Sequence, residues 1–342
     1  KTMRVKLEDV CERGTSSLMQ KDIVDKNGKY PVYGASGRIG SMETYQQEHQ
    51  TVAVVKDGAG IGRTMLLPEK SSIIGTMQYL IPKNCIEPEY LYYAVKYMHL
   101  EKYFSGATIP HIYFRDYKTE EFNLHNKTEQ QEIISTLKRV EAVISNRREQ
   151  LAMLDELVKA RFVEMFGDPI SNPFGFKVKT LQKMIDDGTI MYHLDGNHGS
   201  DYPRNEEFVE CGVPYISANC IVHNDVNLKL AKHLTEERAS KLRKGIAQNG
   251  DVLFAHNATV GPVAILYTDD EKVILGTSLT AYRCDKERMV PDYLKAYMQS
   301  EGFVCQYTKD MKQTTRNQVP ITAQRKFLFV IPPLSLQNQF AA

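Results

Sequence analysis

The sequence has almost no net charge, because 43 Lys and Arg residues are balanced by 42 Asp and Glu residues, for a formal charge of +1. Proteins that bind nucleic acid usually carry a clear basic excess, so the overall balance weighs against that function. DNA binding remains open where basic groups are clustered locally. One such cluster lies between Lys309 and Lys326, where five basic residues accompany one acidic residue.

Signatures of a membrane protein or a secreted disulfide scaffold are also missing. No apolar run approaches the length of a membrane span, and the first ten residues are typical of an amphipathic strand rather than a signal peptide. The six cysteines form no CxxC pair, and no histidine cluster lies near them at zinc spacing. We therefore expect a cytoplasmic protein with reduced thiols, no membrane partner and no metal site; a disulfide framework is the less favoured alternative.

Motifs for nucleotide binding and hydrolysis are absent as well. There is no GxxxxGK[ST] loop for ATP, no GxSxG nucleophile turn and no HExxH zinc site. Gly58 and Gly60 follow an apolar run, but a dinucleotide loop would need its third glycine where Arg63 stands. We interpret these glycines as the turn of a hairpin, and we expect no catalytic residue and no cofactor in this chain.

What the sequence does contain is an internal duplication. Residues 51–67 and 250–266 each have an apolar run, a polar turn with a glycine and a second apolar run, which is typical of a β-hairpin. The later landmarks recur in the same order, and they are Gly75-Thr76 and Gly276-Thr277, Pro88–Leu91 and Pro291–Leu294, Ser105–Ile112 and Lys312–Ile321, and Thr128–Gln131 and Ser335–Asn338. Upstream, residues 31–36 resemble residues 214–218 more loosely. This order predicts two similar α+β domains; the alternative is two unrelated α+β domains that share turn chemistry.

Between the halves, residues Lys127 to Phe166 contain no Gly and no Pro. Helix-forming residues dominate, Thr128 and Gln131 suit a capping box, and Gly167 suits the end of a helix. The apolar residues follow a 3.5-residue repeat, which predicts a coiled coil about 60 Å long rather than an ordinary helix packed on one domain. The seam residues that we expect to bind a partner are Ile133, Leu137, Val140, Ile144, Arg147, Leu151, Leu154, Val158 and Arg161.

Two tandem α+β domains joined by a long coiled-coil helix, with no catalytic motif, resemble the specificity subunits of type I restriction-modification systems. The hairpins, Gly-Thr pairs, polar loops and the helix tail LVKARFVEMFGDP at 157–169 carry the resemblance, which covers essentially the whole chain. It implies structurally similar α/β target-recognition domains at 1–126 and 168–333 and a central spacer helix at 127–167. Residues 334–342 would start a second spacer helix, whose remainder we expect beyond Ala342 or from another chain.

The resemblance implies that each domain reads one half of a split DNA sequence and that the spacer sets the gap between the halves. The implied partners are double-stranded DNA, two methyltransferase subunits that carry S-adenosylmethionine, and motor-nuclease subunits that use ATP and Mg. Self-association through the spacer helix is a further option. The chain itself would catalyse nothing. Two alternatives stay open: a coiled-coil scaffold that binds no DNA, and the recognition part of a fused restriction-methylation enzyme.

Basic, amide and hydroxyl side chains in the turns and polar loops are the candidate DNA contacts, because Arg suits guanine and Asn or Gln suits adenine in the major groove. Those of the first half are Lys56, Arg63, Thr76, Gln78 and His111. Those of the second half are His256, Asn257, Thr277, Lys312, Thr314, Thr315, Arg316, Asn317 and Gln318. The 312–318 loop is the favoured site, because it combines basic and amide groups in an otherwise neutral chain.

Overall fold

The structure, a computed structural model, describes residues 3–23, 28–106, 110–311 and 317–342. The chain divides into two compact units, Lys1–Glu149 and Gln150–Ala342. Each unit mixes helices with sheets and has a hydrophobic core of its own. The α+β class and the two tandem domains with a long helix, all predicted from the sequence, are confirmed.

A four-stranded antiparallel sheet forms the centre of the first unit. Its order is β2 (Cys11–Thr15), β8 (Met77–Pro82), β5 (Thr51–Val55) and β6 (Thr64–Leu67). Every residue of the TVAVV run in β5 is buried, because this β-branched strand lies inside the sheet and α2 (Pro88–Tyr97) packs over it. The remaining elements are β1 (Met3–Lys6) paired with β9 (Glu121–Leu124), the sheet of β4 (Gly37–Met42), β3 (Tyr30–Gly34) and β7 (Ser72–Ile73), and the short helices α1 (Leu7–Val10), η1 (Gln20–Asp22), η2 (Leu100–Tyr103) and α3 (Phe114–Tyr117).

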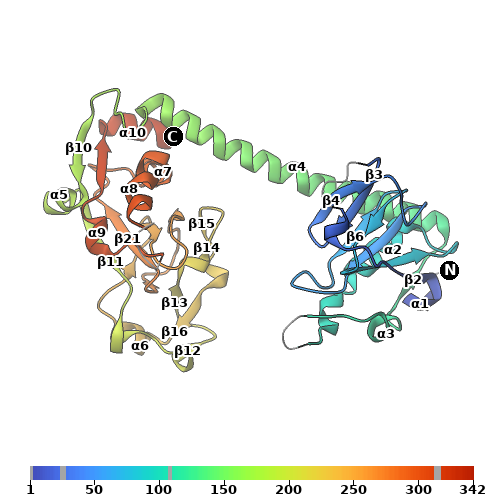
Figure 1. The fold of residues 1–342 in the computed structure, drawn as a ribbon. Coiled ribbons are helices and arrows are strands. Elements are labelled where there is room, and N and C mark those ends of the chain that lie inside the picture. The colour runs from blue at the N-terminus through green and yellow to red at the C-terminus, as the bar shows by residue number, and fades with distance from the viewer. Residues whose placement is uncertain (1–2, 24–27, 107–109, 312–316) are drawn as a thin grey trace. The chain divides into compact units, whose positions relative to one another are not determined.

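The second unit repeats this plan with additions. Its antiparallel sheet has the order β11 (Ile190–Asp195), β21 (Leu279–Cys284), β18 (Val252–Ala255) and β19 (Val263–Ile265). α7 (Pro291–Gln299) packs on β18 and β19 as α2 packs on β5 and β6. In Figure 1, β12, β13, β16 and α6 lie at the opposite end of this unit from α7 and α10.

The remaining elements of the second unit complete two smaller sheets, a hairpin and the helices around them. They are β10 (Lys177–Thr180) paired with β22 (Leu328–Ile331), the five-stranded sheet of β12 (Phe208–Val209), β16 (Lys232–Leu234), β13 (Val213–Ile216), β20 (Val273–Leu275) and β17 (Ile246–Ala247), the hairpin of β14 (Ile221–Val222) and β15 (Asp225–Val226), and the helices α5 (Leu181–Asp186), η3 (Gly199–Asp201), η4 (Asn205–Glu207), η5 (Ala218–Cys220), η6 (Leu228–Leu230), α6 (Glu236–Ser240), α8 (Glu301–Met311), α9 (Ile321–Gln324) and α10 (Leu334–Ala341).

Corresponding buried glutamines tie the last helix of each unit to the helix that covers its sheet. Gln130 accepts a hydrogen bond from the Glu87 N–H at 2.8 Å, and Gln337 accepts one from the Val290 N–H at 2.9 Å. Glu87 and Val290 precede α2 and α7, so both amides satisfy an N–H at a helix start. Each glutamine also donates to the carbonyl five residues before it. The duplication seen in the sequence therefore extends to individual buried hydrogen bonds.

α4 (Lys127–Phe166) is one continuous helix of 40 residues, and it ends at Gly167, whose φ of +74° suits glycine. The capping box predicted at Thr128 and Gln131 is wrong. The Asn126 side chain accepts from the Glu129 N–H at 2.9 Å, and the Glu129 carboxylate accepts from the Asn126 N–H at 3.3 Å. Asn126 ranks above threonine as a cap, and starting the helix there places Thr128 inside its first turn.

Aromatic packing joins the end of α4 to the second unit. Phe162 and Phe166 are each only 3% exposed and belong to the main core of that unit. Phe340 of α10 packs against both rings, with centroid separations of 5.9 and 5.5 Å. Near the start of α4, Ile134 is buried in the core of the first unit. The helix is thus anchored at each end by side chains that face a different core.

Candidate nucleic-acid interface

In each unit the tip of the central hairpin meets a polar loop that comes from later in the chain. In the first unit we call this meeting of hairpin tip and loop the first loop cluster. Here the Ile112 N–H donates to the Lys56 carbonyl at 2.9 Å. The Gly58 N–H donates to the Pro110 carbonyl, also at 2.9 Å. The Lys56 N–H donates to the Thr76 carbonyl at 3.0 Å, which adds the turn after β7. Three segments distant in sequence therefore form one surface.

The second loop cluster has the same backbone pattern. The Val319 N–H donates to the His256 carbonyl at 2.8 Å, and the Ala258 N–H donates to the Asn317 carbonyl at 3.1 Å. The His256 N–H donates to the Ser278 carbonyl at 2.9 Å. The counterpart of Thr76 is consequently Ser278, so the Gly-Thr pairs matched by sequence are out of register by one residue. Sequence reasoning missed Ser278 because its only local signal was the neighbouring Gly-Thr pair.

Asp57 is the electrostatic centre of the first loop cluster. Its carboxylate forms an ion pair with Lys56 and lies 2.7 Å from the His111 Nδ1 atom. Arg63 is exposed, and one of its guanidinium nitrogens donates to the Ala35 carbonyl at 2.6 Å. Thr76 is exposed at the same surface. Lys56, Arg63, Thr76 and His111 are therefore brought together, and each keeps some access to solvent.

Two exposed residues beside this cluster escaped the sequence reasoning. The Arg115 guanidinium lies over the Tyr113 ring, with 4.7 Å to its centroid, and the His111 and Tyr113 rings are stacked with 6.3 Å between centroids. Tyr113 is 45% exposed. An aromatic ring flanked by Arg and His offers stacking and phosphate contacts to nucleic acid. The available signal was the composition of the HIYFR run, which places His111, Tyr113 and Arg115 close together in the sequence.

Gln78 and His256 are corrected by the structure, because neither side chain can reach DNA in this conformation. Gln78 is 2% exposed within β8, and His256, directly after β18, is 1% exposed. Burial lowers the pKa of His256, which keeps its ring neutral. The His256 Nδ1 atom lies 3.2 Å from the Val319 carbonyl, so the ring contacts the backbone directly after Asn317 and Gln318 from the protein interior.

The remaining candidates of the second unit divide into placed and unplaced residues. Asn317 is exposed, and Asn257, Thr277 and Gln318 are half-buried. A backbone bridge joins Asn257 to Gln318 across the hairpin tip. The other four candidates lie outside the residues that the structure describes, and they are Lys312, Thr314, Thr315 and Arg316.

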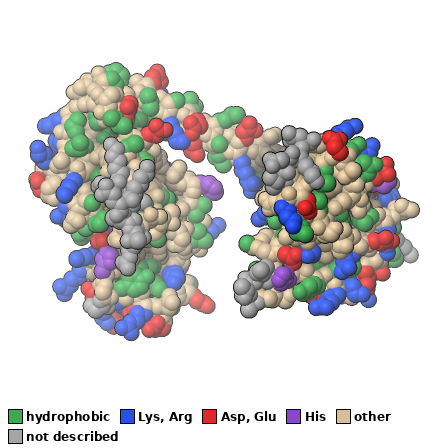
Figure 2. All heavy atoms as spheres, in the orientation of Figure 1, with side chains coloured by type: hydrophobic (Ala, Val, Ile, Leu, Met, Phe, Trp, Pro, Cys, Tyr) green, Lys and Arg blue, Asp and Glu red, His purple; other side chains and the backbone are tan. Residues whose placement is uncertain are grey.

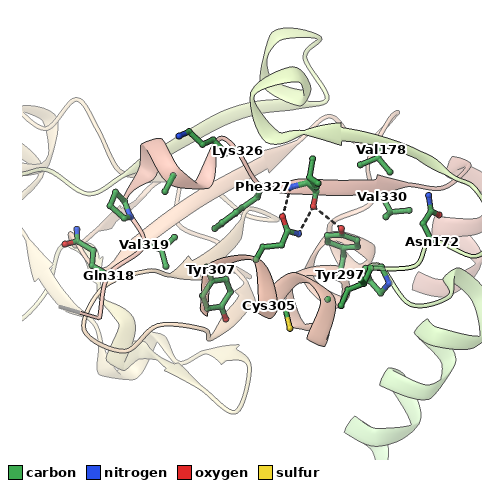
Figure 3. Close-up of a pocket in the computed structure, with 17 residues that line it drawn as sticks. Asn172, Val178, Tyr297, Cys305, Tyr307, Gln318, Val319, Lys326, Phe327 and Val330 are labelled. Atoms are coloured by element: carbon green, nitrogen blue, oxygen red, sulfur yellow. Dashed lines mark hydrogen bonds between the residues drawn. The ribbon is translucent and has the colours of Figure 1, made fainter. Parts of the chain in front are cut away.

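A cavity of about 680 Å³ adjoins this loop between α8, α9 and β22, and Figure 3 shows its lining. Gln318 and Val319 lie at one end, and Tyr297 and Val330 lie at the other. Among the described residues that line it, Lys326 is the one charged side chain, and none is a carboxylate or a histidine. Among the residues that the structure describes, no group of three or more His, Cys, Asp or Glu side chains could hold a metal ion.

The predicted partner seam of α4 is largely open to solvent. Leu151 is 64% exposed, Leu154 57% and Val158 51%. Val140 and Ile144 are exposed to 49% and 46%, which extends the apolar stripe along the middle of the helix. The seam residues nearest the first unit, Ile133 and Leu137, are half-buried, and Ile133 packs on its core. Arg161 pairs with Glu164 at 2.8 Å, and Arg147 is exposed.

Figure 2 shows Lys and Arg side chains interspersed with Asp and Glu on the drawn face of each unit, in keeping with the balanced charge of the sequence. No helix among the described residues is long and apolar enough to cross a membrane.

Comparisons with known proteins agree with this geometry. Residues 1–154 match the family model for the type I restriction modification DNA specificity domain. The type I restriction enzyme MjaIX specificity subunit of Methanocaldococcus jannaschii is 27% identical over 154 residues, which cover 42% of this chain and 36% of that subunit. The matched part thus spans little more than a third of that relative's length.

Among solved structures, the S subunit of the type I restriction-modification system from M. genitalium has a TM-score of 0.57 at 17% identity, over 99% of this chain and 87% of that one. The HsdS subunit from Thermoanaerobacter tengcongensis has a TM-score of 0.40 at 16% identity, over 99% and 87%. The first part of the chain is thus similar to a type I specificity domain, and the whole chain is similar in fold to a type I S subunit. The resemblance predicted from the sequence is confirmed.

Proposed function

We propose that this chain is a DNA-reading specificity subunit, in which each unit reads one half of a bipartite target. The observation that carries the proposal is the pair of loop clusters, which share their backbone hydrogen bonds and differ in their side chains. A common frame with different side chains is what two readers of different sequences need, because phosphate contacts position a protein on DNA and base contacts specify the sequence.

The exposed stripe of α4 supports a second part of the proposal, which concerns partners. Side chains such as Leu151 and Leu154 would be costly to leave in water, and their 3.5-residue spacing suits a second helix. We assign this stripe to docking, either of the two methyltransferase subunits or of a spacer helix from the same or another chain. The methyltransferases would supply S-adenosylmethionine, and motor-nuclease subunits would supply ATP and Mg chemistry. The chain itself would bind no cofactor, catalyse nothing and act on DNA in the cytoplasm.

The decisive experiment is co-expression with an adenine methyltransferase subunit from the same genome, followed by mapping of methylated adenines across the genome. A split motif with two half-sites and a fixed gap is the expected result. If the purified chain binds no duplex, alone or with the methyltransferase, it is a scaffold and the proposal fails. Methylation without this chain would also overturn it, because the specificity would then reside elsewhere.

Arg63→Ala tests the first loop cluster directly. We expect weaker duplex binding and a salt dependence reduced by about one unit of slope, because one phosphate contact contributes roughly 0.9. Arg4→Ala is the matched control: Arg4 is an exposed arginine of the same unit that pairs with Glu121 on the β1–β9 ribbon. Equal effects of the two substitutions, in a titration of a fluorescent duplex against salt, would remove Arg63 from the interface.

A further inference from the structure

A single carbonyl in the second loop cluster is held from inside the protein. The Val319 carbonyl accepts from the Gln324 side-chain amide at 3.0 Å and lies 3.2 Å from the His256 Nδ1 atom. Both side chains are buried, since Gln324 is 0% exposed and His256 is 1% exposed. Val319 directly follows Gln318 and Asn317, two of the candidate base contacts. These two buried side chains therefore contact the Asn317–Val319 segment from the protein interior, on the side away from solvent.

The hydrogen bonds of Gln324 determine its orientation. A carbonyl can only accept, so the Gln324 nitrogen must face Val319, and its second N–H donates to the Thr280 hydroxyl at 3.1 Å. The Gln324 oxygen then accepts from the Tyr282 hydroxyl at 2.7 Å and from the His193 ring at 3.1 Å. The amide thus makes four hydrogen bonds, to β11, β21 and the loop. A fully satisfied buried amide of this kind specifies one arrangement of its partners.

The same reasoning determines the tautomer of His256. Because the Val319 carbonyl can only accept, the His256 Nδ1 atom must carry the proton. The backbone of His256 also accepts from the Val319 N–H at 2.8 Å. Val319 is therefore bonded at both its N–H and its carbonyl, and the position of the loop follows from the buried network.

The first unit holds the equivalent loop by different chemistry. At the position of Gln324, at the end of α3, stands Tyr117, whose hydroxyl has no hydrogen-bond partner among the described residues. Lys56 replaces His256, and the loop is bonded instead through the solvent-accessible pair of His111 and Asp57. The buried network is consequently specific to the second unit, although the backbone pattern is common to both.

We propose that Gln324 and His256 are positioning residues that hold the Asn317–Val319 segment in its reading position, so that they govern recognition of one half-site without touching DNA. This inference rests on the proposed function. Removal of the donors to Val319 should free the loop from the hairpin tip. The fold of the second unit should persist, because Val319 and Tyr282 are only two of the many side chains in its main core, which also includes Tyr293, Phe303 and Phe329.

Four variants test the proposal in the full chain. Gln324→Met keeps the length of the side chain and removes all four hydrogen bonds, and His256→Leu removes the ring donor. His256→Asn keeps a donor near the Nδ1 position and should rescue the loss. Gln306→Met is the matched control, because the Gln306 amide hydrogen-bonds to the backbone of Leu328 in the same unit.

The first measurement is amide hydrogen exchange resolved to single residues. We expect exchange at Val319 and Ala258 to rise at least about fivefold in Gln324→Met and His256→Leu, since one lost hydrogen bond is worth about a factor of five. Exchange at Ile112 and Gly58, their counterparts in the first unit, should stay unchanged. Unchanged exchange at Val319, or an equal rise throughout β18 and β21, would overturn the positioning role.

The second measurement is competition between duplexes in the presence of the methyltransferase. The wild-type target from the methylation map competes against duplexes scrambled in one half-site or in the other. We expect Gln324→Met and His256→Leu to lose discrimination at a single half-site. His256→Asn should restore this discrimination, and Gln306→Met should keep it. Equal loss at both half-sites contradicts the inference while leaving the proposed function intact. If the wild-type chain binds no duplex, the proposed function fails and the half-site role fails with it, whereas the exchange data still decide whether the loop is held.

Discussion

The buried amides of Gln130 and Gln337 offer a test of the duplication at the level of stability. Gln130 makes three hydrogen bonds, to the Glu87 N–H and to the carbonyls of Cys85 and His125. Gln130→Leu removes the partner of all three backbone groups, at a cost of about 1–3 kcal/mol for each one that water cannot reach. With some recovery from water and from the added apolar burial, we expect the free energy of unfolding of the first unit to fall by about 3 kcal/mol.

Gln337 makes two corresponding bonds, to the Val290 N–H and the Pro332 carbonyl. Gln337→Leu should therefore destabilise the second unit by about 2 kcal/mol. For units of this size, each kcal/mol lowers the melting temperature by about 2–4 °C, so shifts of about 6–12 °C and 4–8 °C follow. The larger effect belongs to Gln130 because its amide satisfies one more carbonyl.

Calorimetry combined with amide exchange measures these effects unit by unit. The matched controls are Gln131→Leu and Gln339→Leu, which change exposed glutamines on the same helices. Each buried substitution should raise exchange in its own unit and leave the other unchanged. The reasoning is refuted if a buried variant melts within 1 °C of its exposed control, or if Gln130→Leu destabilises the second unit as much as the first.

Three further predictions concern the spacer and the second unit. Leu151→Glu should abolish binding of the helical partner in a pull-down without changing the circular dichroism of the free chain, because this side chain is 64% exposed; Glu149→Gln, at an exposed position beside it, should bind normally. A seven-residue insertion in the middle of α4 should widen the gap of the methylated motif by about 3 base pairs with the same bases read, since seven helical residues add about 10 Å; altered half-site bases would contradict the spacer role. Burial lowers the pKa of His193 to about 4 from its usual 6.5, with Asp195, Arg325 and His256 as its charged or titratable neighbours. The unfolded chain then binds this proton more tightly, so the second unit should lose up to about 3 kcal/mol of stability as the pH falls from 6.5 to 4, and denaturation of His193→Gln with urea should show a weaker pH dependence.

Local patterns in the sequence determined the long helix and the two hairpins. The absence of Gly and Pro between Lys127 and Phe166 leaves nothing to interrupt a helix, and its apolar repeat marks the exposed stripe. The apolar run before Gly58 and the run before Gly261 each turn back on themselves as predicted. These features depend on neighbours within a few residues, so a single sequence is enough to predict them.

Only the tertiary structure decided which polar residues face outwards. Gln78 is polar, so strand alternation alone does not predict that it is buried. It is buried because both faces of its sheet are covered. His256 and Gln324 come from segments far apart in the sequence, and their meeting at the Val319 carbonyl depends on long-range packing. The one-residue shift that matches Thr76 with Ser278 likewise follows from hydrogen bonds between distant strands. Such contacts are set by the register of the sheets and the closure of the core, which local propensities do not encode.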